Sequence, residues 1–240
     1  MELSKLSDAV RRALPADYCG AVIVAAGTAS RMGGIDKVMA DLNGEPMIVH
    51  TVRAFQNCNA IREIVIVTRE DLIIPITNCC ASFSKVQAVV VGGDTRQASV
   101  NLGMNALSKQ VKLVAIQDGA RPLITGQLID RVVRAAGHFG AAAPAVPVKD
   151  TIKVVQGGLV QATPDRARLR AVQTPQVFDI DLLRGALKNA QDTGAQVTDD
   201  CSAVELMGMT VKIVEGDERN LKVTTPLDLA VAKILLEEAK

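Results

Sequence analysis

The stretch CGAVIVAAGTASRMGG, residues 19–34, gives the clearest indication of the fold. Its first half is an apolar run without polar alternation, which is typical of a β-strand buried on both faces of a parallel sheet. Its second half consists mostly of small residues. The turn at Gly27 allows backbone N–H groups to approach an anion without obstruction by a Cβ atom. We therefore expect a buried strand that ends in an anion-binding loop, with an ordinary solvated turn as the alternative.

Similar runs follow along the chain and alternate with helical patterns. The predicted strands are residues 20–26, 61–68, 86–93 and 111–119. The predicted helices between them are residues 46–58, 94–107 and 125–140. Such alternation predicts an α/β fold in which helices cover a mostly parallel sheet. The functional site is expected at the carboxyl ends of the strands.

The pattern changes near residue 147, where period-two segments flank Gly157 and Gly158. A Gly-Gly pair between alternating segments predicts a β-hairpin. Because an isolated hairpin is only marginally stable in water, we expect it to pack on something else, such as a second subunit. The remaining chain is predicted to form helices at 180–194 and 198–208, a strand at 209–216 and a closing helix at 225–240.

The composition argues against several classes of protein. The 240 residues suit one α/β domain over residues 19–240, with an N-terminal extension at 1–18. Lys and Arg (27) nearly balance Asp and Glu (26), which argues against a nonspecific nucleic-acid or membrane-surface binder. We identify no signal peptide or membrane-spanning run. Five cysteines without a C-x-x-C motif disfavour a zinc site or disulfide framework, so we expect a protein of the reducing cytoplasm.

Three strand ends carry residues that suggest chemistry. Arg31 and Lys37 follow the first strand and could hold a triphosphate. Asp118, at the end of the fourth strand, is placed to hold Mg²⁺, which prefers hard oxygen ligands. Asp94 lies in a glycine-containing loop whose peptide groups could contact a base or ribose. Because these strand ends share one edge of the sheet, the sequence favours a single composite site there.

Each loop also has a purely structural interpretation. Asp118 could pair with Arg121, and Asp94 or Thr95 could cap the next helix. The TDD segment at 198–200 could supply a metal-binding carboxylate pair or cap a helix. Both histidines, His50 and His138, are interpreted as structural. No cysteine has a plausible base at recognisable spacing, which disfavours nucleophilic catalysis.

Seven motifs, taken in order, resemble one family. They are AAGTASRMGGIDKV, GGDTRQASV, QDGARP, DTIK, AVQTPQVF, TDDCSAVE and NLKVTTPLDLAVAKILL, and they extend from about Ala21 to the C-terminus. The chain resembles the 2-C-methyl-D-erythritol 4-phosphate cytidylyltransferases of the non-mevalonate isoprenoid pathway. The resemblance implies a three-layer, mostly parallel, Rossmann-like nucleotidyltransferase sheet. It also implies that a β-hairpin arm at about residues 148–170 protrudes as a dimerisation element.

The resemblance further implies a reaction and its site. CTP and 2-C-methyl-D-erythritol 4-phosphate would give 4-diphosphocytidyl-2-C-methyl-D-erythritol and pyrophosphate, with Mg²⁺ or another divalent cation, in a homodimer. Arg31 and Lys37 would neutralise charge at the reacting phosphate, and Asp118 would bind the metal. The residues implied in nucleotide binding are Ala25, Ala26, Gly27, Gly93, Asp94, Ser99 and Arg121. Those implied in binding methylerythritol phosphate are Thr151, Arg166, Thr198 and Lys222, with Arg166 contributed across the dimer.

The chain departs from this family pattern at several points. Ala29 replaces a common second glycine, Asp36 replaces a frequent proline, and Gly119 replaces a common alanine. The interval between Arg31 and Lys37 is one residue shorter than in many members.

Three functions other than that of the methylerythritol phosphate cytidylyltransferases are possible alternatives. A ribitol-5-phosphate cytidylyltransferase shares much of the loop pattern, but DTIK and NLKVTTP favour the methylerythritol enzyme. A noncatalytic nucleotide-binding module is the second alternative, and the retained charged residues argue against it. A dehydrogenase is disfavoured because the dinucleotide-binding motif is absent.

Overall fold

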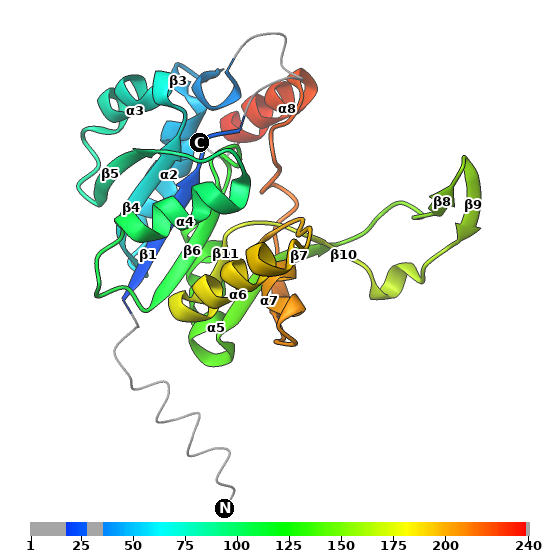
Figure 1. The fold of residues 1–240 in the computed structure, drawn as a ribbon. Helices are drawn as coiled ribbons and strands as arrows, with labels where there is room; N and C mark the ends of the chain where they lie inside the picture. Colours follow the sequence, from blue (N-terminus) through cyan, green and yellow to red (C-terminus); the bar gives the residue numbers. More distant parts are fainter. Residues whose placement is uncertain (1–17, 28–35, 239–240) are drawn as a thin grey trace, which may run out of the picture.

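A central β-sheet organises the chain (Figure 1). The computed structural model describes residues 18–27 and 36–238. Within them, eight strands form one sheet in the order β10-β7-β11-β6-β1-β4-β5, with β12 paired to β7. The strands are β1 (Cys19–Val24), β4 (Ile61–Thr68), β5 (Val86–Val91), β6 (Leu113–Asp118), β7 (Ala141–Pro147), β10 (Arg170–Val172), β11 (Gln176–Asp179) and β12 (Lys212–Glu215).

The half of the sheet formed by β6, β1, β4 and β5 is entirely parallel. In its register Val24 lies beside Asp118 on one side and Val67 on the other, so that these strands end at a common edge. Almost all side chains of β1 and β6 are buried. This explains why both strands appear in the sequence as apolar runs without alternation.

The other half of the sheet is mixed. β11 runs antiparallel to β6 and β7, whereas β7 pairs in parallel with β12 and antiparallel with β10. The predicted α/β class with a mostly parallel sheet is confirmed. Strands β7, β10 and β11 were not predicted, because β7 is the Ala- and Pro-rich AAAPAVP and the other two span only three or four residues.

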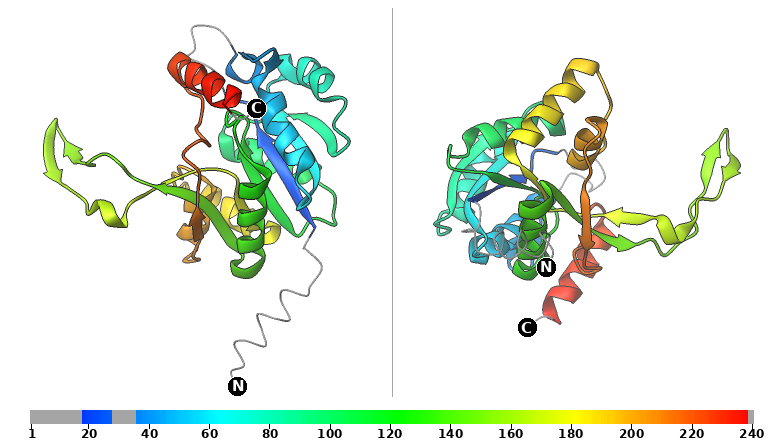
Figure 2. Two further views of the ribbon diagram at one scale, coloured as in Figure 1. Left: turned by 180° about the vertical axis from the view of Figure 1, so that it is seen from behind. Right: turned by 90° about the horizontal axis from the view of Figure 1, so that it is seen from below.

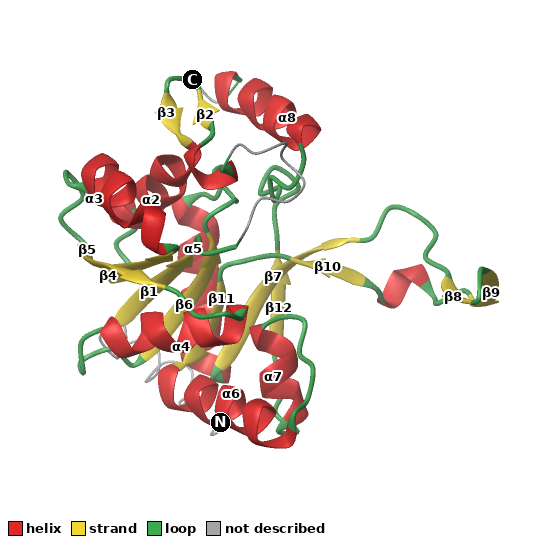
Figure 3. Cartoon of the chain, turned by 45° about the horizontal axis from the view of Figure 1, so that its top comes forward, coloured by secondary structure: helices red, strands yellow, loops and turns green. Residues whose placement is uncertain are grey.

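Helices cover both faces of the sheet (Figures 2 and 3). One core joins Ile23 of β1 to one helical layer, and a second core joins Val22 to the opposite layer, as strand alternation requires. The first layer consists of α2 (Met47–Asn57), α3 (Ile73–Cys80) and α5 (Gly126–Phe139). The second consists of α4 (Arg96–Ala106), α6 (Ile180–Thr193) and α7 (Asp200–Leu206).

A third, smaller core positions the segment that precedes the last helix. Helix α8 (Pro226–Glu237) packs near the short hairpin of β2 (Asp41–Leu42) and β3 (Glu45–Pro46). Val223 is buried in this core, and its N–H donates to the carbonyl of Ala120 at 2.8 Å. Lys222 is thereby held close to the end of β6.

Several predicted boundaries were wrong by a few residues. Helix α4 begins at Arg96, because Thr95 accepts the Ala98 N–H and acts as the N-cap. Helix α7 begins at Asp200, because Asp199 caps it in a capping box with Ser202. The predicted strands at 86–93, 111–119 and 209–216 are shorter in the structure. Within the described residues, no helix is long and apolar enough to cross a membrane.

Residues 148–169 extend away from the rest of the molecule, and we call this segment the arm (Figure 1). Its strands β8 (Val154–Gln156) and β9 (Leu159–Ala162) form a separate two-stranded sheet. The turn between them is the predicted Gly157-Gly158 pair, whose φ angles of +57° and +79° favour glycine. The short helix η3 (Arg166–Arg168) leads back to β10, where the chain rejoins the main sheet.

Candidate functional site

The carboxyl edge of the parallel strands is hollowed into a cavity of about 310 Å³. Its walls come from the end of β1, the loop between β5 and α4, the end of β6, the short helix η1 (Lys37–Met39) and the segment before α8. The described residues that line it are Val24, Ala25, Ala26, Gly27, Lys37, Val38, Gly93, Asp94, Thr95, Arg96, Ser99, Asp118, Ala120 and Lys222. The cavity therefore lies at the edge of the sheet where the sequence predicted a site.

Most of the predicted site residues are brought together at this cavity, and a few lie elsewhere. Arg121 lies behind Asp118 rather than in the described lining. Thr151 and Arg166 are exposed on the arm, and Thr198 is exposed in the loop before α7. Arg31, with Ala29, lies outside the described residues.

The wall between β5 and α4 is closely packed. A Cβ atom on Gly92 would lie 2.7 Å from Ala26 Cβ, and one on Gly93 would lie 2.6 Å from Ala98 Cβ. The Gly93 N–H donates to Ser99 Oγ at 3.1 Å, and that hydroxyl lies 3.3 Å from the Gly93 carbonyl. Glycine is therefore required here for the loop to approach the first strand end, which leaves backbone groups beside the cavity.

Asp118 is an almost fully buried carboxylate surrounded by cations. Its Oδ2 lies 2.9 Å from Lys222 Nζ and 3.7 Å from Arg121 Nε. Burial opposes ionisation, but the charges of Lys222, Arg96 and Arg121 together hold the pKa of Asp118 below its ordinary value. The suggested Asp118–Arg121 pair is thus present, although the contact to Lys222 is the shorter one. Asp118 is ionised at neutral pH and faces the cavity.

A second ion pair, which was not predicted, joins the cavity-lining Arg96 to the buried Asp200, which is not among the lining residues. Arg96 Nη1 lies 2.8 Å from Asp200 Oδ2, and the Asp200 side chain is 1% exposed. Burial raises the pKa of Asp200. Arg96 occurs in the GGDTRQASV motif, but its partner could not be found from the sequence, because the pair depends on how α4 and α7 lie in the same helical layer.

A polar segment behind the cavity holds several of its parts. The Thr174 hydroxyl accepts the Asp118 N–H at 3.1 Å, and the Thr174 carbonyl accepts from Asn220 Nδ2 at 2.9 Å. Gln176 Oε1 accepts the N–H groups of Asp200 and Cys201, while its Nε2 donates to Asp199 at 2.7 Å. The QTPQ motif thus ties the end of β6, the segment before α8 and the start of α7 to one another.

The suggested carboxylate pair at Asp199 and Asp200 serves structural roles in this chain. Asp199 caps α7, and Asp200 pairs with Arg96. The described part of the chain contains no group of three His, Cys, Asp or Glu side chains suited to hold a metal ion. Two carboxylates of the described residues, Asp94 and Asp118, line the cavity, and Asp118 at the end of β6 is the predicted Mg²⁺ ligand. One carboxylate fits Mg²⁺ that is held mainly by phosphate oxygens and water.

The histidines and cysteines do not form a nucleophilic site among the described residues. His50 Nε2 is hydrogen bonded to the carbonyl of Leu42 at 2.8 Å. Burial raises the pKa of the thiols of Cys58, Cys79, Cys80 and Cys201 above their ordinary value. Raised thiol pKa values disfavour the thiolate that nucleophilic catalysis needs.

Comparison with known proteins identifies the family. The family model for 2-C-methyl-D-erythritol 4-phosphate cytidylyltransferase matches residues 19–238. A relative of that name from Desulforamulus reducens is 44% identical over 222 residues, which cover 90% of this chain and 95% of the relative. Another, from Caldanaerobacter subterraneus subsp. tengcongensis, is 44% identical over 91% of this chain and 98% of its own length.

Solved structures agree with the sequence matches. The 4-diphosphocytidyl-2C-methyl-D-erythritol synthase of Anaerococcus prevotii aligns with a TM-score of 0.84 at 28% identity, over 93% of this chain and 100% of that one. The 2-C-methyl-D-erythritol 4-phosphate cytidylyltransferase of Thermus thermophilus aligns with a TM-score of 0.76 at 32% identity, over 92% of this chain and 99% of that one. The family suggested by the seven motifs is confirmed: the chain belongs to the 2-C-methyl-D-erythritol 4-phosphate cytidylyltransferases, which are nucleotidyltransferases.

Proposed function

We propose that this chain transfers the CMP group of CTP to 2-C-methyl-D-erythritol 4-phosphate and releases pyrophosphate. In this reaction a phosphate oxygen of the acceptor attacks the α-phosphorus of CTP, and the bond from that phosphorus to the bridging oxygen of pyrophosphate breaks. The observation that carries the proposal is the cavity itself, which is lined by Lys37, Lys222 and the ionised Asp118, with Lys222 paired to Asp118. Such a site can position two phosphates and stabilise developing negative charge.

The nucleoside end of CTP is assigned to the closely packed wall. The residues of this wall that line the cavity are Ala25, Ala26, Gly27, Gly93, Asp94 and Ser99. Donors and acceptors fixed by packing suit recognition of a base and ribose. Lys37, at the start of η1, is assigned to neutralise the negative charge of the reacting phosphate. Arg31 is assigned the same role. Arg121 orients this end of the site by pairing with Asp118 and donating to the Asn220 carbonyl at 2.6 Å.

Asp118 is assigned as the protein ligand for Mg²⁺ or another divalent cation. A bound divalent cation would neutralise phosphate charge and fix the geometry of the triphosphate. The chain's contribution is to keep the carboxylate ionised and oriented, through Lys222, Arg121 and the Thr174 hydroxyl.

The acceptor is assigned to Thr151, Thr198 and Lys222, and to Arg166 contributed across a homodimer. Support for the second subunit comes from the arm, whose side chains are almost all exposed. Val155, Leu159 and Val160 are 54%, 71% and 59% exposed, which is unusual for apolar side chains in strands. A second copy that packs against the arm would bury them.

We also place the enzyme in the cytoplasm. None of the five cysteines, all of which lie in the described part of the chain, forms a disulfide. That state fits a reducing compartment.

Pyrophosphate release tests the function. The purified chain is incubated with CTP, Mg²⁺ and either 2-C-methyl-D-erythritol 4-phosphate or ribitol 5-phosphate. We expect release with the methylerythritol substrate and at most a small fraction of that rate with ribitol phosphate. Release with ribitol phosphate alone would replace the acceptor assignment. If neither acceptor gave release while CTP still bound, the chain would be a noncatalytic nucleotide-binding module.

A further inference from the structure

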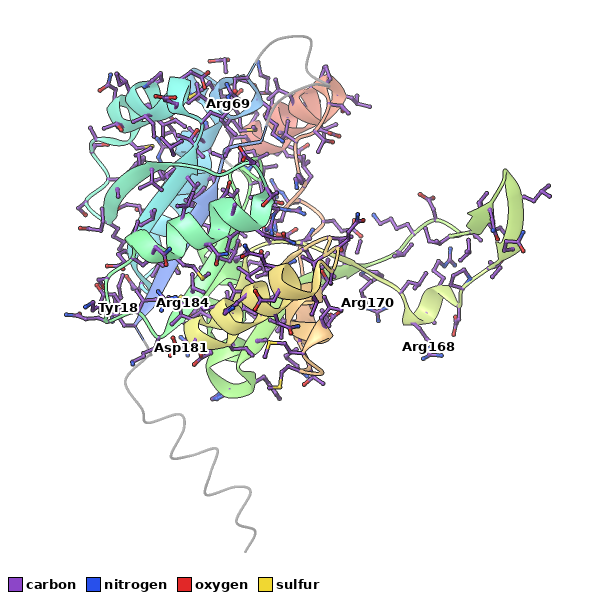
Figure 4. All side chains as sticks on the ribbon, in the orientation of Figure 1. Tyr18, Arg69, Arg168, Arg170, Asp181 and Arg184 are labelled. Carbon is purple, nitrogen blue, oxygen red and sulfur yellow. The ribbon has the colours of Figure 1, made fainter. Side chains whose placement is uncertain are left out.

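Arg69 lies just after β4 and outside the cavity lining (Figure 4). It contacts two carboxylates. Its Nε and Nη2 donate to the two oxygens of Asp71 at 3.0 and 2.8 Å. Its Nη1 donates to Oδ2 of Asp36. The side chains of Arg69 and Asp36 are 28% and 16% exposed. Because Asp36 immediately precedes Lys37, this guanidinium is tied to the backbone that carries a proposed catalytic residue.

Asp36 also organises the backbone on the other side of Lys37. Its Oδ1 accepts the Val38 N–H at 3.1 Å and caps η1. Its carbonyl accepts the Met39 N–H at 3.1 Å, and Val38 is buried in the core. Lys37 therefore lies between an ion-paired capping residue and a buried side chain. Its backbone position depends directly on where the Asp36 carboxylate is held.

We propose that Arg69 is a positioning residue for Lys37 and acts through Asp36. A lysine side chain is a flexible four-carbon stem. Its ammonium group therefore reaches a reacting phosphate reproducibly only if the lysine backbone is held in place. Small displacements of catalytic groups cost large factors in rate. This inference rests on the proposed role of Lys37 in phosphate transfer.

The competing explanation is an ion pair that only stabilises the surface. The chain offers a matched control for it in Arg53, which donates to both oxygens of Glu45 at 2.8 and 2.6 Å. Those two side chains are 40% and 43% exposed and lie outside the cavity lining. Arg53→Met likewise removes a two-point arginine–carboxylate pair, but the carboxylate in that pair belongs to Glu45, which is not adjacent to Lys37 in the chain.

The experiment measures kcat for pyrophosphate release and the dissociation constant for CTP. Arg69→Met is expected to lower kcat about fivefold and to change CTP affinity less than twofold. Arg53→Met is expected to leave both values unchanged. In a Lys37→Met background, whose own kcat is expected to be more than about tenfold below wild type, Arg69→Met should have no further effect.

Asp36→Pro is expected to remove the effect of Arg69→Met on kcat. A contact that only stabilised the fold would not show this rescue. Asp36 has a φ of −66°, which is the value that a proline ring imposes. Proline at position 36 fixes this angle without a carboxylate, so the substitution is expected to retain most activity. In its presence, Arg69→Met should become silent.

Three results would overturn the role of Arg69. They are a wild-type kcat for Arg69→Met, a fivefold loss that persists in the Lys37→Met background, and a loss that persists in the Asp36→Pro background. If Arg69→Met does not fold, Asp36→Asn replaces it, because asparagine can still cap η1 but lacks the charge that pairs with Arg69. Its kcat should fall similarly, and an unchanged kcat would contradict the proposal. A wild-type chain that releases no pyrophosphate would instead refute the proposed function, and this role with it.

Discussion

Ile66 of β4 and Val160 of β9 are both β-branched residues in hydrogen-bonded strands, yet the first is fully buried and the second is 59% exposed. Ile66 lies in a parallel sheet with helices on both faces. Val160 lies on the arm, where every residue of β8 and β9 is exposed. The contacts within one chain therefore account for the sheet and its cavity. The arm instead exposes apolar side chains, as a surface does that another molecule covers.

The largest expected effect concerns the cavity. Asp118→Asn keeps the shape of the side chain but removes the charge that pairs with Lys222 and Arg121 and that the proposed metal site would need. We expect kcat to fall by about 10²–10³, as measured by pyrophosphate release. The arm should be unaffected, so the oligomeric state in size-exclusion chromatography is the control. A variant with kcat within tenfold of wild type would exclude Asp118 from a metal-binding role.

A pair of matched truncations tests the comparison between sheet and arm directly. Ile66→Ala is expected to lower the free energy of unfolding by about 2–5 kcal/mol, because it leaves a cavity in the core. Val160→Ala should change that free energy by less than about 0.5 kcal/mol when the chain is monomeric. Urea unfolding at low protein concentration measures both values. A loss above about 1 kcal/mol for Val160→Ala would show that the arm packs against its own chain.

Mixed dimers test whether the arm completes a neighbouring site. Arg166→Ala and Lys222→Ala should each be nearly inactive as pure dimers. If Arg166 acts across the dimer, then random mixing of the two variants restores both residues at one site of each mixed dimer. About a quarter of all sites would then be intact, and activity should recover to about that fraction of wild type. Activity no higher than that of either parent would place Arg166 in its own subunit's site.

The regions also differ in how much could be predicted from sequence. The strands around Val22, Ile64 and Ile116 were predictable because burial on both faces produces apolar runs. Parallel strands share an edge, so the same reasoning brought Gly93 and Asp118 to one place. The arm's hairpin was predicted from local turn chemistry alone.

What could not be predicted depends on packing between distant segments. The Arg96–Asp200 pair requires α4 and α7 to meet over the sheet, and the contact of Arg69 with Asp36 requires the end of β4 to lie beside η1. Neither has a periodic signal in the chain. At Gly119, where the family commonly has alanine, a Cβ atom would lie 2.9 Å from Ile48 Cδ1 and 3.2 Å from the Val24 carbonyl oxygen, so alanine would fit only if the end of the Ile48 side chain shifted.

The smallest expected effect is a pH dependence that belongs to the cavity. The pKa of Asp118 is held below its ordinary value of 3.8, despite burial, by the charges of Lys222, Arg96 and Arg121. A carboxylate whose pKa is lower in the folded than in the unfolded chain stabilises the folded state at pH values above the unfolded pKa. This stabilisation is lost as the pH falls through the pKa of the folded state. Wild-type stability should therefore fall more steeply than that of Asp118→Asn below about pH 4, as measured by urea unfolding from pH 7 to pH 2. Parallel curves would mean that Asp118 has the same pKa in the folded and unfolded chain.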